Sequence, residues 1–162
     1  MSIFLNLTAF IIFFILSIGC LFAFQKCQIA VGGKYLDSVV SYKEANELIS
    51  ELDVSQARNH LYITIILDSL YIICYGFILF SIALFFSRLE GVWRILPALA
   101  AVLSDLLENI TQILALLKKT GRNAVIGQKY PILRLKSIFS ILKWFFISVA
   151  IGCPFLSYFA SL

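Results

Sequence analysis

Long apolar stretches separated by polar connections make up most of this 162-residue chain. Four stretches, over about 3–24, 61–86, 95–117 and 136–157, reach the roughly 20 helical residues that cross the hydrocarbon core of a bilayer. Their runs of Leu, Ile and Phe are continuous, whereas the strands of a membrane barrel alternate apolar and polar residues. We therefore predict an all-α integral membrane protein, in which residues 1–162 form a single transmembrane domain, a four-helix bundle.

The first polar connection is the longest and carries a helical pattern of its own. Ser41 followed by Glu44 fits a capping box that opens a helix. Apolar residues then recur at spacings of three and four against an acidic face. We predict a short amphipathic helix over about 41–53. Because anionic lipid attracts Lys- and Arg-rich faces, this acidic helix is expected to pack against the bundle.

Composition agrees with a membrane protein and gives its expected orientation. Hydrophobic residues make up 61% of the chain, charged residues 14%, and the mean hydropathy is +0.96. The net charge of +4 does not indicate nucleic-acid binding, because the lysines and arginines flank the spans. Ten lie in the first and third connections and two in the second. The positive-inside rule places the two basic connections in the cytoplasm and both termini outside.

Two other interpretations are disfavoured: a cleaved signal peptide at the start of the chain, and a membrane thiol oxidoreductase. The first apolar stretch lacks a preceding basic residue and is about twice the usual length of a signal-peptide core, so we read it as a span of the mature protein. The four cysteines include no CxxC pair, which the membrane thiol oxidoreductases use to exchange electrons.

The third span carries a polar face. Asp105, Glu108, Asn109 and Gln112 follow the spacing i, i+3, i+4 and i+7, which places them on one side of a helix. An ionised side chain near the centre of a span costs roughly 2.5 to 3.5 kcal/mol on insertion scales, so such residues face the bundle interior and indicate function. The third span is therefore predicted to carry a site.

The second and fourth spans add polar residues. Tyr71 and Tyr75 follow Asp68 at i+3 and i+7, so these three share a face of the second span. Lys143 lies in the fourth span, with Ser140 and Lys136 one and two turns earlier on the same face. Asp68, Glu108 and Lys143 lie about seven to eleven residues from the same side of the membrane, a depth of roughly 10 to 16 Å.

These residues predict one shared polar site. We assign them to two groups: catalytic candidates Asp68, Asp105, Glu108 and Lys143, and ligand-binding candidates Tyr71, Tyr75, Asn109, Gln112 and Ser140. No metal-ligand set is recognised, and no cofactor is assigned. Three carboxylates against one lysine leave two excess negative charges if all ionise, so either carboxylates carry protons or a cation or basic ligand completes the site.

The alternative is that the polar residues only hold the helices together. Polar contacts between membrane helices average well below 1 kcal/mol and reach about 1 to 2. Four ionisable groups would cost about 10 kcal/mol to insert. Helix association alone therefore explains them poorly. The single histidine, His60, is expected to be a solvated or capping residue at the start of the second span, with a metal or proton-relay role as the alternative.

The segments LDSLYIICYGF, LSDLLEN and SIFSILKW resemble a group of uncharacterised bacterial four-span membrane proteins. Its pattern is an Asp followed by aromatics in the second span, Asp-x-x-Glu-Asn in the third and Leu-Lys-aromatic in the fourth. The resemblance covers about residues 58–147. It implies a helical bundle in the bacterial inner (cytoplasmic) membrane with the shared polar residues, and it implies no particular activity.

Three function classes remain open. The leading hypothesis is an intramembrane pocket that binds a small or lipidic ligand, with acid/base catalysis on a lipid or isoprenoid-like substrate if the protein is an enzyme. The second is proton- or cation-coupled transport, or a channel subunit. The third is an accessory or immunity-type subunit that binds a partner through outward residues such as Trp144 and Phe145. The bilayer is the partner common to all three, and a homo-oligomer or a membrane partner subunit remains open.

Overall fold

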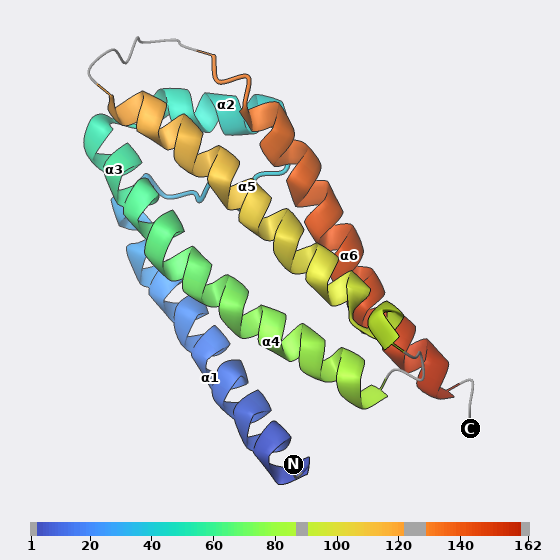
Figure 1. Ribbon diagram of the computed structural model, residues 1–162. Helices are drawn as coiled ribbons and strands as arrows, with labels where there is room; N and C mark the ends of the chain where they lie inside the picture. Colours follow the sequence, from blue (N-terminus) through green and yellow to red (C-terminus); the bar gives the residue numbers. More distant parts are fainter. Residues whose placement is uncertain (1–2, 87–90, 122–128, 160–162) are drawn as a thin grey trace.

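The computed structural model describes residues 3–86, 91–121 and 129–159, and within these ranges it contains helices and no strand, as predicted (Figure 1). Four of the described helical segments are long and apolar enough to cross a membrane. The transmembrane helices are α1 (Ile3–Cys27), α3 (Val54–Ile63) continued through η2 (Thr64–Asp68) into α4 (Ser69–Phe86), α5 (Leu96–Thr120) and α6 (Leu133–Phe159). The chain is thus a multi-pass membrane protein built as a four-helix bundle.

The second span begins earlier than its hydropathy predicts. Asp53 caps α3 with a capping box: its Oδ1 accepts a hydrogen bond from the Gln56 backbone N–H at 2.7 Å, and Gln56 Oε1 accepts one from the Asp53 N–H at 3.1 Å. The helix then passes through the π-helical turn η2, which ends at Asp68. Such turns interrupt α-helices frequently at functional sites.

The helices form two pairs that meet through α4. α1 packs along α4, α5 packs along α6, and α4 also contacts both α5 and α6 (Figure 1). Gly76 allows the close approach of α4 to α5, because a Cβ atom at this position would lie 2.9 Å from Val102 Cγ2. α1 is therefore the helix held mainly by a single partner.

The predicted amphipathic helix exists as α2 (Tyr42–Glu51) and lies across one end of the bundle (Figure 1). Ala45 and Ile49 are buried in a core that includes Ala115 and Leu133 of the bundle, so the helix packs against protein. The predicted capping box is wrong. Ser41 is the N-cap residue, but its side chain makes no capping hydrogen bond, and Glu44 lies 3.7 Å from Lys34 on the surface instead.

Residues 34–41, which we call the inserted segment, pass beneath α2 and send two apolar side chains into the bundle, while residues 34, 38, 40 and 41 stay exposed (Figure 1). Leu36 and Val39 are 0% and 1% exposed. The Tyr35 hydroxyl donates a hydrogen bond to the Phe24 carbonyl of α1 at 2.5 Å. The sequence pattern indicated an ordinary hydrophilic connection, and the structure instead builds part of the bundle interior from it.

Candidate functional site

The polar face of α5 points into the bundle, as predicted. Asp105, Glu108, Asn109 and Gln112 are all at most 3% exposed. The opposite side of α5 is apolar and exposed, with Leu103, Leu106, Leu107, Ile110 and Leu114. A polar interior and an apolar outer surface are the arrangement expected where lipid surrounds the bundle.

Lys143 of α6 lies at the centre of a carboxylate cluster. Its Nζ atom is 2.9 Å from Asp37 Oδ1, 3.0 Å from Asp105 Oδ1 and 2.8 Å from Glu108 Oε2. The lysine side chain is 6% exposed. An ammonium group has three N–H donors, and three carboxylates surround this one: two from α5 and one from the inserted segment.

Glu108 has a second ammonium partner, Lys136. The distance from Lys136 Nζ to Glu108 Oε1 is 2.8 Å, and both side chains are 0% exposed. Ser140 donates a hydrogen bond to the same Oε1 at 2.5 Å, and Lys136 also donates to the carbonyl of Val39. The sequence placed Lys136 at the edge of the third connection and on the same face of the fourth span as Ser140 and Lys143. In the structure all three side chains lie on the buried face of α6.

The three carboxylates around Lys143 have a spacing that would also suit a metal ion, because ligand oxygens of Asp37, Asp105 and Glu108 lie within 4.8 Å of one another. The Lys143 ammonium lies within 3.0 Å of an oxygen of each. The positive charge that these oxygens require is thus supplied by lysine in this structure.

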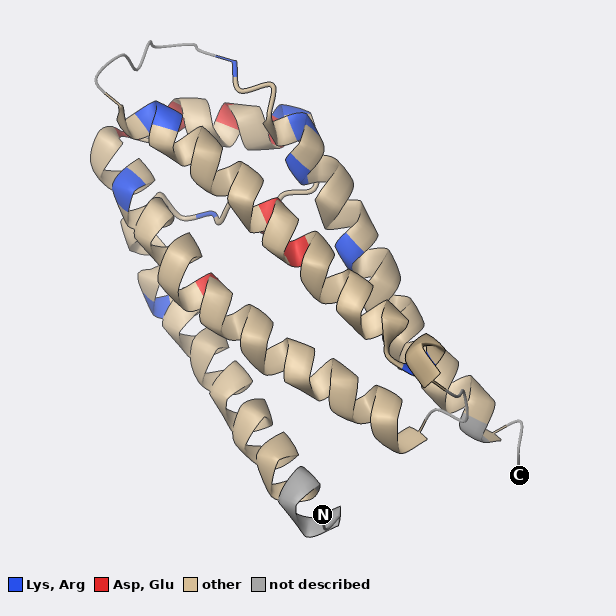
Figure 2. Cartoon of the chain, in the orientation of Figure 1, with Lys and Arg blue, Asp and Glu red and all other residues tan. Residues whose placement is uncertain are grey.

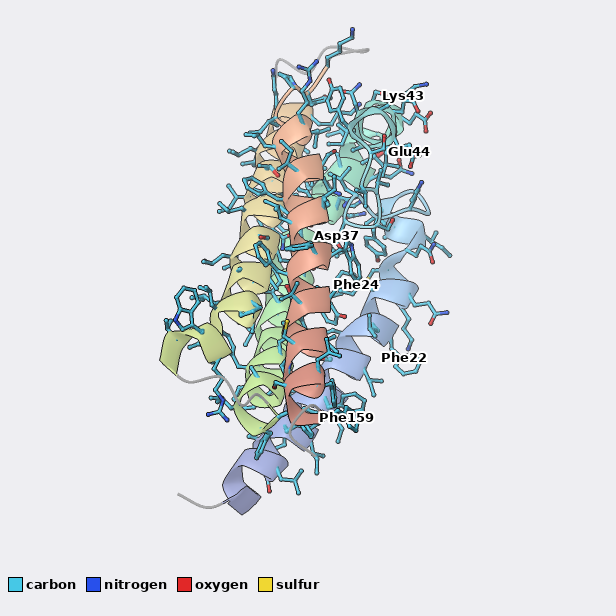
Figure 3. The ribbon with its side chains drawn as sticks, turned by 90° about the vertical axis from the view of Figure 1, so that its right-hand side faces the viewer. Phe22, Phe24, Asp37, Lys43, Glu44 and Phe159 are labelled. Carbon is cyan, nitrogen blue, oxygen red and sulfur yellow. The ribbon has the colours of Figure 1, made fainter. Side chains whose placement is uncertain are left out.

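A cavity of about 450 Å³ adjoins the cluster. Figure 3 shows Phe24 of α1 and Asp37 of the inserted segment on the side of α6 that faces α1. The end of the cavity nearer α2 is polar, with Tyr35, Asp37, Ser38, Asp68, Tyr71, Tyr75, Asp105 and Lys143. The Phe24 ring also lies at this end, against Tyr35 and Tyr71, and the remaining wall is apolar, with Leu21, Ile78, Leu79, Ile82, Trp144, Ile147 and Ile151.

Asp68 differs from the other buried acids of the cavity. It is 4% exposed, and within the described parts of the chain no lysine, arginine or histidine lies at ion-pair distance from it. Asp105, by contrast, is held by Lys143 through Oδ1 and by the Tyr75 hydroxyl, which donates to Oδ2 at 2.5 Å. Figure 2 shows the acidic residues within the bundle in the half nearer α2.

The structure brings the predicted residues together in two groups. Asp68, Tyr71, Tyr75, Asp105 and Lys143 line the cavity. The other four, Glu108, Asn109, Gln112 and Ser140, are buried between helices and are not among its lining residues.

Asp37 is the site residue that the sequence did not reveal. It lies 106 residues from its partner Lys143 along the chain, so no helical periodicity links the two. The available signal was local: Tyr35, Leu36 and Val39 surround a lone acid in a connection otherwise read as hydrophilic. Large apolar side chains on both sides of an acid are a reason to expect that the segment around it packs against the core.

The expectation for His60 was also wrong. Because α3 begins at Val54, His60 lies within a helix, and it is 1% exposed rather than solvated. Its Nε2 lies 3.3 Å from the Lys34 carbonyl, and its ring packs edge-on against Tyr35. His60 therefore helps to fix the inserted segment on α3.

Fold and site together define a multi-pass membrane protein with charged residues buried inside its helical bundle. Comparison of the chain with protein-family models, curated proteins and solved structures finds no match.

Proposed function

We propose that this protein binds an amphiphilic molecule that enters its cavity from the membrane. The observation that carries the proposal is the division of one cavity into a charged end and an apolar remainder. A volume of about 450 Å³ lies in the range of small-molecule sites, which are mostly apolar with a few convergent polar groups. A polar head group would lie at the charged end and an alkyl or isoprenoid tail against the apolar wall.

The cavity is elongated along the bundle. Its lining on the second span runs from Asp68 to Ile82, a rise of roughly 20 Å at 1.5 Å per residue. On α6 the lining runs in the same direction, from Lys143 to Ile151. A shape with the charges at one end suits a molecule that is longer than it is wide.

The packing of α1 suggests the route of entry. α1 packs along α4, whereas α6 packs mainly along α5, and residues of both α1 and α6 line the cavity. The side between α1 and α6 therefore faces the lipid (Figure 3). A molecule would enter sideways from the bilayer, with the head group moving toward Asp68 and Lys143.

Acid/base chemistry on the ligand, if it occurs, would involve Asp68 and Asp105. These two carboxylates line the cavity, whereas Glu108 is 0% exposed and engaged by two lysines and a serine. Glu108 and Lys136 would then position Lys143 rather than touch the substrate.

Native mass spectrometry of the protein extracted in mild detergent tests the proposal. Bound lipid or another amphiphile is expected on the wild type, and Ile78→Trp, which fills the apolar wall, is expected to remove it. The matched control is Ile73→Trp on the outer face of α4, where the side chain is 61% exposed. Equal occupancy in both variants would contradict binding in the cavity.

A second candidate, proton-coupled transport, is favoured by a buried polar seam between α3 and α5. His60, Thr64 and Asp68 follow one another at intervals of four residues, and Gln112 lies on α5; all four are at most 4% exposed. Gln112 Nε2 and His60 Nδ1 have no hydrogen-bond partner among the described residues. Buried polar atoms of this kind are commonly satisfied by water, which would give Asp68 a hydrated path to the end of the bundle.

Proton flux into proteoliposomes tests this candidate. Transport predicts flux in the wild type that Gln112→Leu reduces at least tenfold, because the variant removes a polar group from the seam. The control is Leu114→Ala on the exposed side of α5, which should leave the flux unchanged. Wild-type flux no higher than in empty vesicles would contradict transport.

We further propose that the end of the bundle carrying α2 faces the cytoplasm of a bacterial cell. The basic connections lie at this end, which the positive-inside rule favours. Selective labelling of a cysteine introduced at Lys43 of α2, in inverted but not in right-side-out vesicles, is the expected result. Because native cysteines are present, the labelling requires a background in which Cys27 and Cys153 are replaced by serine.

A further inference from the structure

We infer that the amphiphile carries a cationic ammonium head group and that Asp68 is the residue that receives it. This inference rests on the proposed function, since it names the chemical class of the ligand for the same cavity. It depends on three features of the polar end: the balance of charge, the use of hydrogen-bond donors and the aromatic rings nearby.

The balance of charge favours a cation. The buried cluster and the cavity wall together hold four carboxylates, Asp37, Asp68, Asp105 and Glu108, and two ammonium groups, Lys136 and Lys143. If all ionise, two negative charges remain in excess. In a low-dielectric interior an uncompensated charge is costly, so a ligand that brings positive charge is favoured.

The lysine of the cavity wall is already engaged by carboxylates, which disfavours an anionic head group. Lys143 is the one cation among the described residues that line the cavity, and its Nζ lies within 3.0 Å of three carboxylate oxygens. A phosphate or carboxylate head would have to displace one of these carboxylates. It would also lie close to Asp68, which has no cation beside it in the described parts of the chain.

Aromatic rings next to Asp68 provide a second attraction for an ammonium group. Tyr71, one turn from Asp68, lies 5.4 Å from Tyr75 and 6.1 Å from Phe24 between ring centroids, and all three rings line the cavity. Ring faces attract cations, and aromatic rings around a carboxylate are typical of sites for amines and quaternary ammonium groups. The same rings would not favour an anion.

Three probes with the same alkyl chain test the head group: dodecylamine, dodecanol and dodecanoate. Each is titrated at pH 7 into the delipidated wild-type protein in detergent, and occupancy is measured by native mass spectrometry. We expect the amine to bind at least tenfold more tightly than the alcohol and the carboxylate more weakly than either. The wild-type series is decisive by itself, so the inference stays testable whatever a variant does to folding.

The variant Asp68→Asn locates the head group. It should lower the affinity for the amine about tenfold and leave the affinity for the alcohol nearly unchanged. The matched control, Glu51→Gln, removes an exposed carboxylate at the end of α2 and should change neither affinity.

The outcomes separate the two proposals. Saturable binding of all three probes with equal affinity, or an amine preference that survives Asp68→Asn, would overturn the ammonium inference while leaving an amphiphile site in place. Absence of saturable binding for every probe, together with no co-purified amphiphile, would overturn the proposed function as well.

Discussion

Two groups of buried charge lie side by side in this bundle and differ in how they are neutralised. The first, which we call the inner cluster, consists of Glu108, Lys136, Ser140 and Lys143 between α5 and α6; it pairs one carboxylate with two lysines at 2.8 Å each. The second, the cavity wall around Asp68 on η2, contains a buried carboxylate with no cation at ion-pair distance in the described chain.

The difference indicates two roles for residues that look alike in the sequence. A buried charge whose partners come from within the protein contributes to the arrangement of the helices. Removing one partner leaves the other charge buried and uncompensated, which strongly destabilises the fold. A buried charge that faces a cavity without a partner contributes little to that arrangement and is available to a ligand. Lys143 belongs to both groups, since it lines the cavity and pairs with Glu108, and Asp105 of the cavity wall pairs with it.

The largest effect is expected in the inner cluster. Glu108→Leu leaves Lys136 buried without its carboxylate, and breaking such a pair on one side typically costs about 3 to 5 kcal/mol of unfolding free energy. Equilibrium unfolding in mixed micelles with increasing SDS measures this loss. The double variant Glu108→Leu/Lys136→Met removes both charges and should recover much of the stability. A single variant as stable as the wild type would show that the inner cluster does not hold α5 to α6.

A smaller effect is expected where the inserted segment meets the cluster. Asp37 is 39% exposed, so its pair with Lys143 is partly screened by solvent, and Asp37→Asn should cost about 1 kcal/mol. Amide hydrogen exchange over residues 34–41 should become faster, because the segment loses one of its two links to α6 and keeps only the hydrogen bond from Lys136 to the Val39 carbonyl. The matched control is Glu44→Gln, which breaks the exposed pair with Lys34 at 3.7 Å and should leave exchange unchanged. Equal exchange in the two variants would contradict the proposed link.

The contrast also explains which parts of the site could be predicted from the sequence. The inward face of α5 followed from helical periodicity, because four polar residues on an apolar span have one favourable direction in lipid. The same reasoning found Asp68 and Lys143. It failed for Asp37, whose contact with Lys143 depends on a chain path that no periodic pattern encodes.

His60 was misread because the second span was taken to begin too late. Hydropathy places the end of a span where polar and charged residues start, so His60 was counted with the boundary. In the structure α3 begins at Val54, where Asp53 caps it, and the His60 side chain lies inside the bundle. The capping residue would therefore have located the start of α3 better than the apolar run. Lys136, by contrast, was placed by its helical spacing on the face of Ser140 and Lys143, and it lies there, 0% exposed.

Tyr35 of the inserted segment should make the stability of the protein depend on pH in the alkaline range. Burial, together with the nearby Cys27, raises the pKa of Tyr35 to about 12 from an ordinary value of about 10. Because the folded state disfavours the ionised phenol, stability is unaffected below pH 10 and falls as the pH rises from about 10 to about 12. Tyr35→Phe should cost about 1 kcal/mol at neutral pH through the lost hydrogen bond to Phe24 and should lessen the alkaline loss. Unfolding of both proteins at pH 8 and pH 11 measures this; an equal alkaline loss would contradict it.

The smallest effect on stability is expected at Asp68, and it separates the two groups most sharply. Asp68→Asn keeps the shape of the side chain and breaks no ion pair within the described chain, so the unfolding free energy without ligand should change by no more than about 1 kcal/mol. The same micelle titration as for Glu108→Leu measures it. A loss of about 3 kcal/mol or more would place Asp68 in the structural group. A small change, beside a large one at Glu108, would mean that the bundle folds without a cation beside this carboxylate, which stays available to a ligand.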